Sequence, residues 1–93
     1  MPSFDVAHVR EQGQNVLLFP LNSGIHHKTD REKAEILAEL EARANAAGLA
    51  GTAAIVWEYG RRTHTYGPRN WQGFLSSLTM TAVLQSVNQQ IRW

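Results

Sequence analysis

Basic and aromatic residues are interleaved along residues 57–71 and could form a binding surface. The candidates are Trp57, Tyr59, Arg61, Arg62, His64, Tyr66, Arg69 and Trp71. Arginine side chains contact phosphates and aromatic rings stack on unpaired bases, as in sheet-based proteins that bind single-stranded nucleic acid. The segment has no RNP-type motif, and its aromatic residues are equally expected in a core beneath a helix. The alternative is therefore an ordinary hairpin with a charged tip.

The loop of residues 21–29 is the second candidate, because it leads from an apolar run into a helical pattern. Ser23, Gly24, Lys28 and Thr29 could bind an anion there, since a helix N-terminus attracts negative charge. The order of glycine, Lys-Thr and helix resembles a P-loop, but a P-loop has a glycine directly before the lysine. Here His27 occupies that position. The sequence therefore argues against nucleotide hydrolysis and leaves an anion site or a plain solvated loop.

Catalytic and metal-binding patterns are weak. His26 and His27 are adjacent and point differently, and the chain has neither cysteine nor an H-x-x-x-H spacing. No serine lies in a nucleophile elbow, and Asp5, Glu11 and Glu58 are most simply surface charges. We therefore expect no metal, no cofactor and no catalytic residue, and the sequence favours a protein that is not an enzyme.

The composition is that of a small globular protein. We expect one domain over residues 1–93, with 43% hydrophobic and 18% charged residues and a formal charge of +1. That charge argues against a dedicated binder of polyanions, so only a local patch could bind nucleic acid. The N-terminus lacks a signal-peptide pattern and no apolar run approaches membrane-spanning length. These features predict a cytoplasmic protein that has no membrane partner.

The same pattern of two apolar runs and a helix occurs twice. Residues 4–9 and 16–21 flank one turn, residues 53–59 and 62–66 flank Gly60-Arg61, and helical spacing follows each pair at residues 30–47 and 80–91. Thr29 and Glu32 have the spacing of a capping box, which marks the start of the first helix. The elements therefore run β-β-α-β-β-α.

The distribution of apolar residues over the strands predicts their positions in the sheet. Residues 16–21 and 53–59 are apolar on both faces and are typical of central strands, whereas residues 4–9 and 62–66 are more polar and are typical of edges. The first helix is long enough for a crossover between parallel strands. We therefore predict an α+β fold with a mixed four-stranded sheet in the order 1-2-3-4.

The number of layers depends on where the helices lie. Helices on opposite faces would give a three-layer sandwich. A wholly antiparallel sheet with both helices on one face would give two layers and leave Phe19 and Trp57 in an exposed apolar patch, which could bind a ligand or a second copy.

Four segments resemble a family of small uncharacterised proteobacterial proteins. They are FDVAHVREQG at 4–13, AGLAGT at 47–52, PRNW at 68–71 and the closing RW at 92–93. The similarity spans nearly the whole chain. The family that these segments resemble is associated with conjugative elements and genomic islands. It implies an accessory role in mobile-element biology, through a protein partner or nucleic acid, and it implies no particular site residues.

The leading functional interpretation is a non-enzymatic module that binds a protein partner or a copy of itself. It would use an uncovered apolar sheet face or the second hairpin. The alternative is a weak nucleic-acid-binding accessory protein that uses the basic and aromatic residues of that hairpin.

Overall fold

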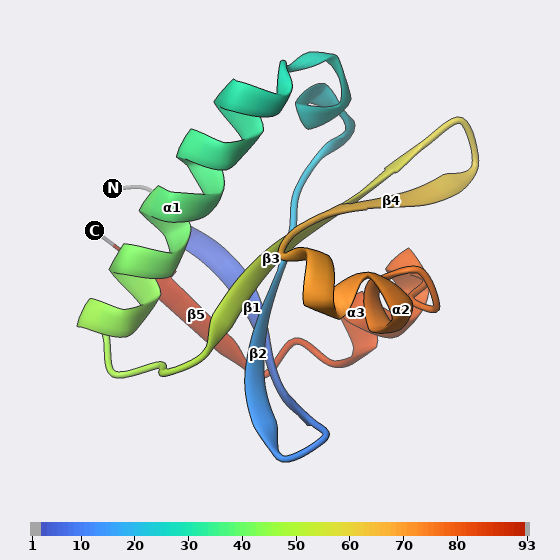
Figure 1. Ribbon diagram of the computed structural model, residues 1–93. Helices are drawn as coiled ribbons and strands as arrows, with labels where there is room; N and C mark the ends of the chain where they lie inside the picture. Colours follow the sequence, from blue (N-terminus) through green and yellow to red (C-terminus); the bar gives the residue numbers. More distant parts are fainter. Residues whose placement is uncertain (1–2, 93) are drawn as a thin grey trace.

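The computed structural model describes residues 3–92, which form a five-stranded mixed sheet between helices (Figure 1). The strands are β1 (Ser3–Glu11), β2 (Gln14–Pro20), β3 (Thr52–Tyr59), β4 (Arg62–Tyr66) and β5 (Gln89–Arg92). The α-helices are α1 (Asp30–Ala46), α2 (Gln72–Leu75) and α3 (Met80–Gln85), and two short 3-10 helices are η1 (Ser23–His27) and η2 (Arg69–Trp71). The predicted α+β class is confirmed.

The sheet has the order β4-β3-β2-β1-β5. β2 and β3 are parallel and are joined by α1, while the other neighbouring strands are antiparallel. The predicted order 1-2-3-4 is therefore correct for the first four strands, and β4 lies at an edge as expected. The prediction of four strands is wrong, because β5 adds a fifth beside β1.

The predicted helix over residues 80–91 is wrong in its second half. α3 ends at Gln85, and Ile91 in β5 pairs with Phe4 in β1. The side chain of Asn88 donates to the His8 carbonyl and accepts from the His8 backbone N–H, at 3.0 and 2.9 Å. These bonds turn the chain onto β1, so β1 is an inner strand and not the edge that its polar residues predicted.

The N-terminus of α1 carries the predicted capping box. The Thr29 hydroxyl accepts from the Glu32 N–H at 3.1 Å, and the Glu32 carboxylate accepts from the Thr29 N–H at 3.0 Å. Near the other end, the Glu41 carboxylate accepts from the Ala53 N–H at 3.0 Å. This bond fixes the helix relative to the start of β3.

Hydrophobic clusters cover both faces of the sheet. On one face, Phe19 and Ile55 are fully buried with Leu40 of α1. On the other face, Leu18 and Val56 pack with side chains of η2, α2 and α3, among them Trp71, Leu75 and Val83. The three-layer alternative is therefore correct, and the exposed apolar patch of the two-layer alternative is absent, since Phe19 is 0% and Trp57 3% exposed. Within residues 3–92, no helix is long and apolar enough to cross a membrane.

Candidate histidine–aromatic binding site

The candidate residues of the second hairpin divide between the two faces of the sheet and the solvent. Trp57 is buried in the cluster under α1, whereas Trp71 is buried in the cluster on the opposite face. Tyr66 is half-buried against the α1 cluster, and Arg69 is exposed on η2. The eight residues therefore do not form one surface, because strand alternation and the η2 turn direct them apart.

Part of that set does come together, with two histidines from another segment. We define the histidine–aromatic patch as His26, His27, Trp57, Tyr59 and His64. The rings of His26 and Tyr59 stack with centroids 3.8 Å apart and planes 7° apart. His27 meets the edge of the Tyr59 ring at 5.4 Å, and His64 meets His26 at 4.9 Å.

The topology of the sheet explains why these residues meet. Pro20 at the end of β2 pairs with Val56, so the segment after β2 lies beside the end of the parallel strand β3. There η1 is held by its buried residue Ile25 and by the Asn22 side chain, which accepts from the Gly24 N–H at 3.0 Å. This arrangement places His26 and His27 against the hairpin.

Trp57 forms the floor of the patch. Trp57 is 3% exposed as a residue. Its ring stacks on that of His64 with centroids 5.7 Å apart and donates from Nε1 to Nδ1 of His26 at 3.2 Å. The register of β3 and β4 places Trp57 directly opposite His64. The ammonium of Lys33 in α1 lies 5.0 Å from the centroid of a Trp57 ring, within the range of a cation–π contact.

The hydrogen bonds assign the neutral histidine tautomers. Nδ1 of His26 accepts from Trp57, so in this arrangement it carries no proton. Nε2 of His64 lies 3.3 Å from the Tyr59 carbonyl, which can only accept, so Nε2 carries the proton. Desolvation lowers the pKa of His26 below its ordinary value of 6.5, and the neighbouring charges of His64, His27 and Lys33 lower it further.

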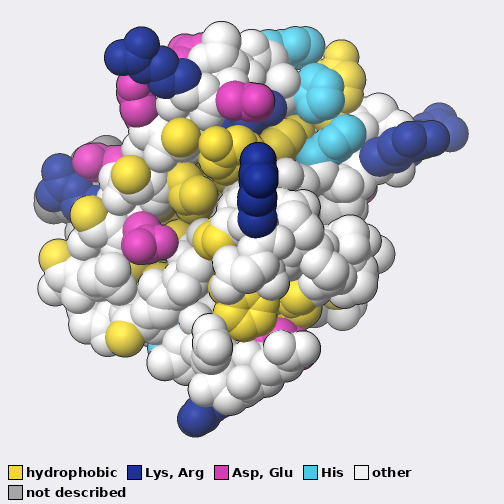
Figure 2. Space-filling view, in the orientation of Figure 1, with side chains coloured by type: hydrophobic (Ala, Val, Ile, Leu, Met, Phe, Trp, Pro, Cys, Tyr) yellow, Lys and Arg dark blue, Asp and Glu magenta, His cyan; other side chains and the backbone are white. Residues whose placement is uncertain are grey.

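Two positively charged side chains lie at the hairpin tip, next to the patch. Arg61, which has the positive φ of 66° required by the turn, and Arg62 are both exposed, and neither makes an ion pair with another described residue. Tyr59 is itself 41% exposed. Figure 2 shows histidine side chains gathered at one end of this face, beside hydrophobic side chains and between basic ones. The surface therefore offers both an aromatic ring and cations to a ligand.

The three histidines pack through their rings. Within residues 3–92, no group of three or more His, Asp or Glu side chains is arranged to hold a metal ion. The contacts among His26, His27 and His64 are edge-to-face, which is a packing arrangement and not a convergence of ring nitrogens on one point. The patch is suited to binding through stacking and charge.

In the loop proposed to bind an anion, the Gly24 N–H and the Thr29 N–H already have hydrogen-bond acceptors. Ser23 and Gly24 begin η1, where the Gly24 N–H donates to Asn22, and Lys28 is exposed. The amide and hydroxyl of Thr29 are bonded to Glu32. An anion at the start of α1 would therefore have to displace a carboxylate that already uses the favourable end of the helix dipole.

No protein-family model, curated protein or solved structure matches this chain. The resemblance to small proteobacterial proteins thus stays a prediction. Sequence reasoning had treated His26 and His27 only as metal ligands and had not placed Lys33 at any site. The predicted parallel pairing of β2 with β3 was the signal that could have brought the loop after β2 to the end of β3.

Proposed function

We propose that the protein is a non-enzymatic binding module whose patch and hairpin tip bind single-stranded nucleic acid. The observation that carries the proposal is the stack of His26 on Tyr59, beside the two exposed arginines Arg61 and Arg62. Stacked aromatic rings next to cations are the common elements of proteins that bind single strands without strong sequence preference.

The Tyr59 ring is the stacking surface in this proposal. His26 covers one face of the ring at 3.8 Å and His27 meets its edge, while 41% of the residue is exposed. The ring is therefore held in one orientation before a base arrives, which lowers the entropy cost of binding. A base would stack on the face opposite His26.

Arg61 and Arg62 supply the phosphate contacts. They lie next to Tyr59 in the hairpin, and Arg62 pairs directly with Tyr59 across the two strands. With a formal charge of only +1 on the whole chain, this local group must provide most of the electrostatic attraction. Binding is therefore expected to be weak and sensitive to salt.

Self-association through a sheet face, the leading interpretation from sequence, loses its basis because clusters cover both faces. What remains of that interpretation is the second hairpin as the binding element. Single-stranded nucleic acid is the better-supported ligand because cations and an exposed ring lie together there.

The test is fluorescence anisotropy of a labelled unstructured oligonucleotide over a series of salt concentrations. Arg61→Ala/Arg62→Ala removes two phosphate contacts, so the slope of log K against log salt should become shallower by about 1.4, at about 0.7 per contact. Tyr59→Ala should cost about 1–3 kcal/mol of binding with little change in slope. Tyr59→Phe should bind as the unchanged protein does.

Arg43→Ala/Arg92→Ala is the matched control, because it removes the same charge from α1 and β5, away from the hairpin. It should leave the salt slope nearly unchanged. The proposal fails if both double variants lose affinity equally, or if the unchanged protein does not alter the anisotropy at low salt.

A further inference from the structure

A hollow on the opposite side of the sheet from the patch is lined mostly by apolar side chains. The space is about 170 Å³ and is lined by Val9 of β1, Leu18 of β2, Phe74 of α2, Leu78 after α2, and Ala82 and Val83 of α3. A dry apolar cavity of about 150 Å³ accepts benzene, so this space has room for one aromatic ring. The short helices α2 and α3 form one side of the hollow, and the strands β1 and β2 form the other.

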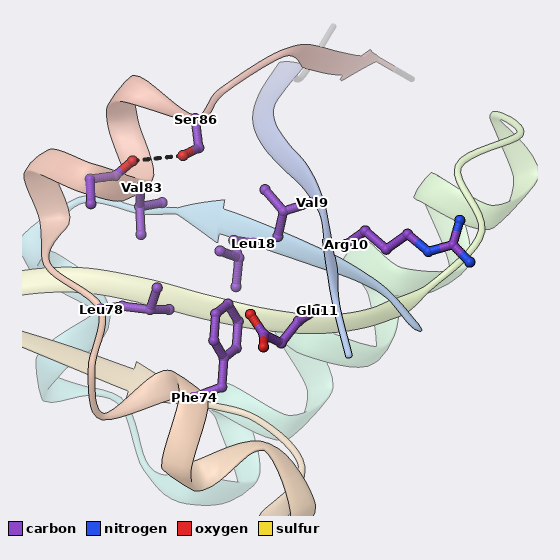
Figure 3. A pocket seen from close by; sticks show the side chains of 9 residues that line it. Val9, Arg10, Glu11, Leu18, Phe74, Leu78, Val83 and Ser86 are labelled. Atoms are coloured by element: carbon purple, nitrogen blue, oxygen red, sulfur yellow. Dashed lines mark hydrogen bonds between the residues drawn. The ribbon is translucent and has the colours of Figure 1, made fainter. Parts of the chain in front are cut away.

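Glu11 places a carboxylate at this apolar hollow. Figure 3 shows the carboxylate turned toward the Phe74 ring, while the Arg10 guanidinium points away. Arg10 donates instead to the Gly13 carbonyl at 3.3 Å, and the Ser86 hydroxyl donates to the Ala82 carbonyl at 2.9 Å. Glu11 is half-buried, and its carboxylate has no hydrogen bond or ion pair with another described residue. Among the lining residues, Glu11 thus has the acidic side chain that is available to contact a ligand.

A second, more polar groove continues from the same place. Glu11 and Phe74 line both spaces, and Asn70, Gly73 and Ser77 line the groove. Glu11 therefore borders both the hollow and the groove. The charge at this junction favours a cation.

We infer that this hollow binds a small organic ammonium ion, with an apolar group the size of a phenyl ring beside Leu18 and Val83 and the ammonium on Glu11. The apolar walls exclude water from the ring, and the carboxylate accepts a charge-assisted hydrogen bond from the ammonium. The site is independent of the proposed nucleic-acid surface, since a different hydrophobic cluster supports it.

The test uses 2-phenylethylammonium as the probe and 2-phenylethanol as its uncharged counterpart, in amide chemical-shift titrations of the labelled full chain. The ammonium should bind roughly tenfold more tightly than the alcohol, as a hydrogen bond to a charged group implies. The largest shifts should fall on Val9, Leu18, Phe74, Leu78 and Val83. Glu11→Gln should remove the preference for the ammonium and keep the binding of the alcohol.

Two further variants separate the two parts of the inference. Ala82→Leu places a larger side chain in the hollow, at a position in a helix, and should abolish the binding of both probes. Glu35→Gln removes one acid from the exposed surface of α1 on the other side of the sheet and should change neither affinity. Equal affinity for the ammonium and the alcohol, shifts confined to other parts of the chain, or no shifts with millimolar probe would each overturn the inference.

Discussion

Gly67 is a position at which one added methyl group should disturb the packing of the fold, because it lies where the second hairpin meets the hydrophobic cluster under α2 and α3. A Cβ atom built on Gly67 would lie 2.9 Å from the Ala54 Cβ and 3.1 Å from the Leu75 Cδ1. Ordinary contacts of this kind are 3.4–4 Å. Ala54 and Leu75 are both buried, so neither can move aside into solvent. Gly67→Ala must therefore shift the backbone of β3 or of the segment after β4.

Overpacking of this kind typically costs about 1–3 kcal/mol. In a domain of this size each kcal/mol lowers the melting temperature by about 4–8 °C. Because the φ of Gly67 lies outside the left-handed region, the cost comes from packing and not from backbone strain. Thermal unfolding followed by circular dichroism, together with urea unfolding to confirm an unchanged m value, measures the loss.

Gly73→Ala is the matched control. A Cβ atom there meets nothing within 4 Å, and the residue lies in α2. Alanine favours a helix over glycine by up to about 1 kcal/mol, so this variant should be as stable as the unchanged protein or slightly more stable. The double variant Ala54→Gly/Gly67→Ala should lose less free energy of unfolding than the sum of the losses in the two single variants, because Ala54→Gly removes the closest contact. A Gly67→Ala protein with unchanged stability would refute the packing argument.

Two more predictions concern histidines. His8→Leu should raise the free energy of unfolding by about 1 kcal/mol, because Nε2 of His8 is buried without a hydrogen bond to any described residue. Urea unfolding measures this change. A lower free energy of unfolding would contradict the prediction and show that Nε2 has a partner such as water. The lowered pKa of His26 means that the unfolded chain binds more protons just below pH 6.5. The contribution of His26 to the free energy of unfolding is therefore fully present above pH 6.5, and it is lost as the pH drops through the lower pKa that His26 has in the folded state. His26→Asn should make the midpoint of unfolding less dependent on pH in that range.

The parts of the fold that follow from local pattern were predictable. The Thr29 capping box requires only Thr29 and Glu32, and the parallel pairing of β2 with β3 follows from two apolar strands joined by one long helix. The second helix was misread because Val83 and Ile91 fit one helical stripe, although they are buried in different clusters on opposite faces of the sheet. Periodicity alone does not distinguish one helix from a short helix followed by a strand.

The candidate site was predictable only where neighbouring strands determine it. Trp57 and His64 face each other across the hairpin, and that pairing follows from the Gly60-Arg61 turn. His26 reaches the same place through the crossover, and the hydrogen bond from Trp57 depends on side-chain orientations that no sequence pattern specifies. The same applies to Glu11, whose carboxylate faces an apolar hollow only because α2 and α3 pack on that face of the sheet.

Trp57 connects the hydrophobic core to the patch, so its replacement cannot separate folding from binding. Its ring packs in the cluster beneath α1 while it also holds His26, His64 and Lys33 in place. Loss of such a large buried side chain typically costs about 3–5 kcal/mol, enough to unfold much of a marginally stable domain. Tyr59 and the two arginines lie outside both clusters, and the hollow at Glu11 is supported by the other one. Variants at the exposed positions therefore test the two proposed sites independently of each other and of stability.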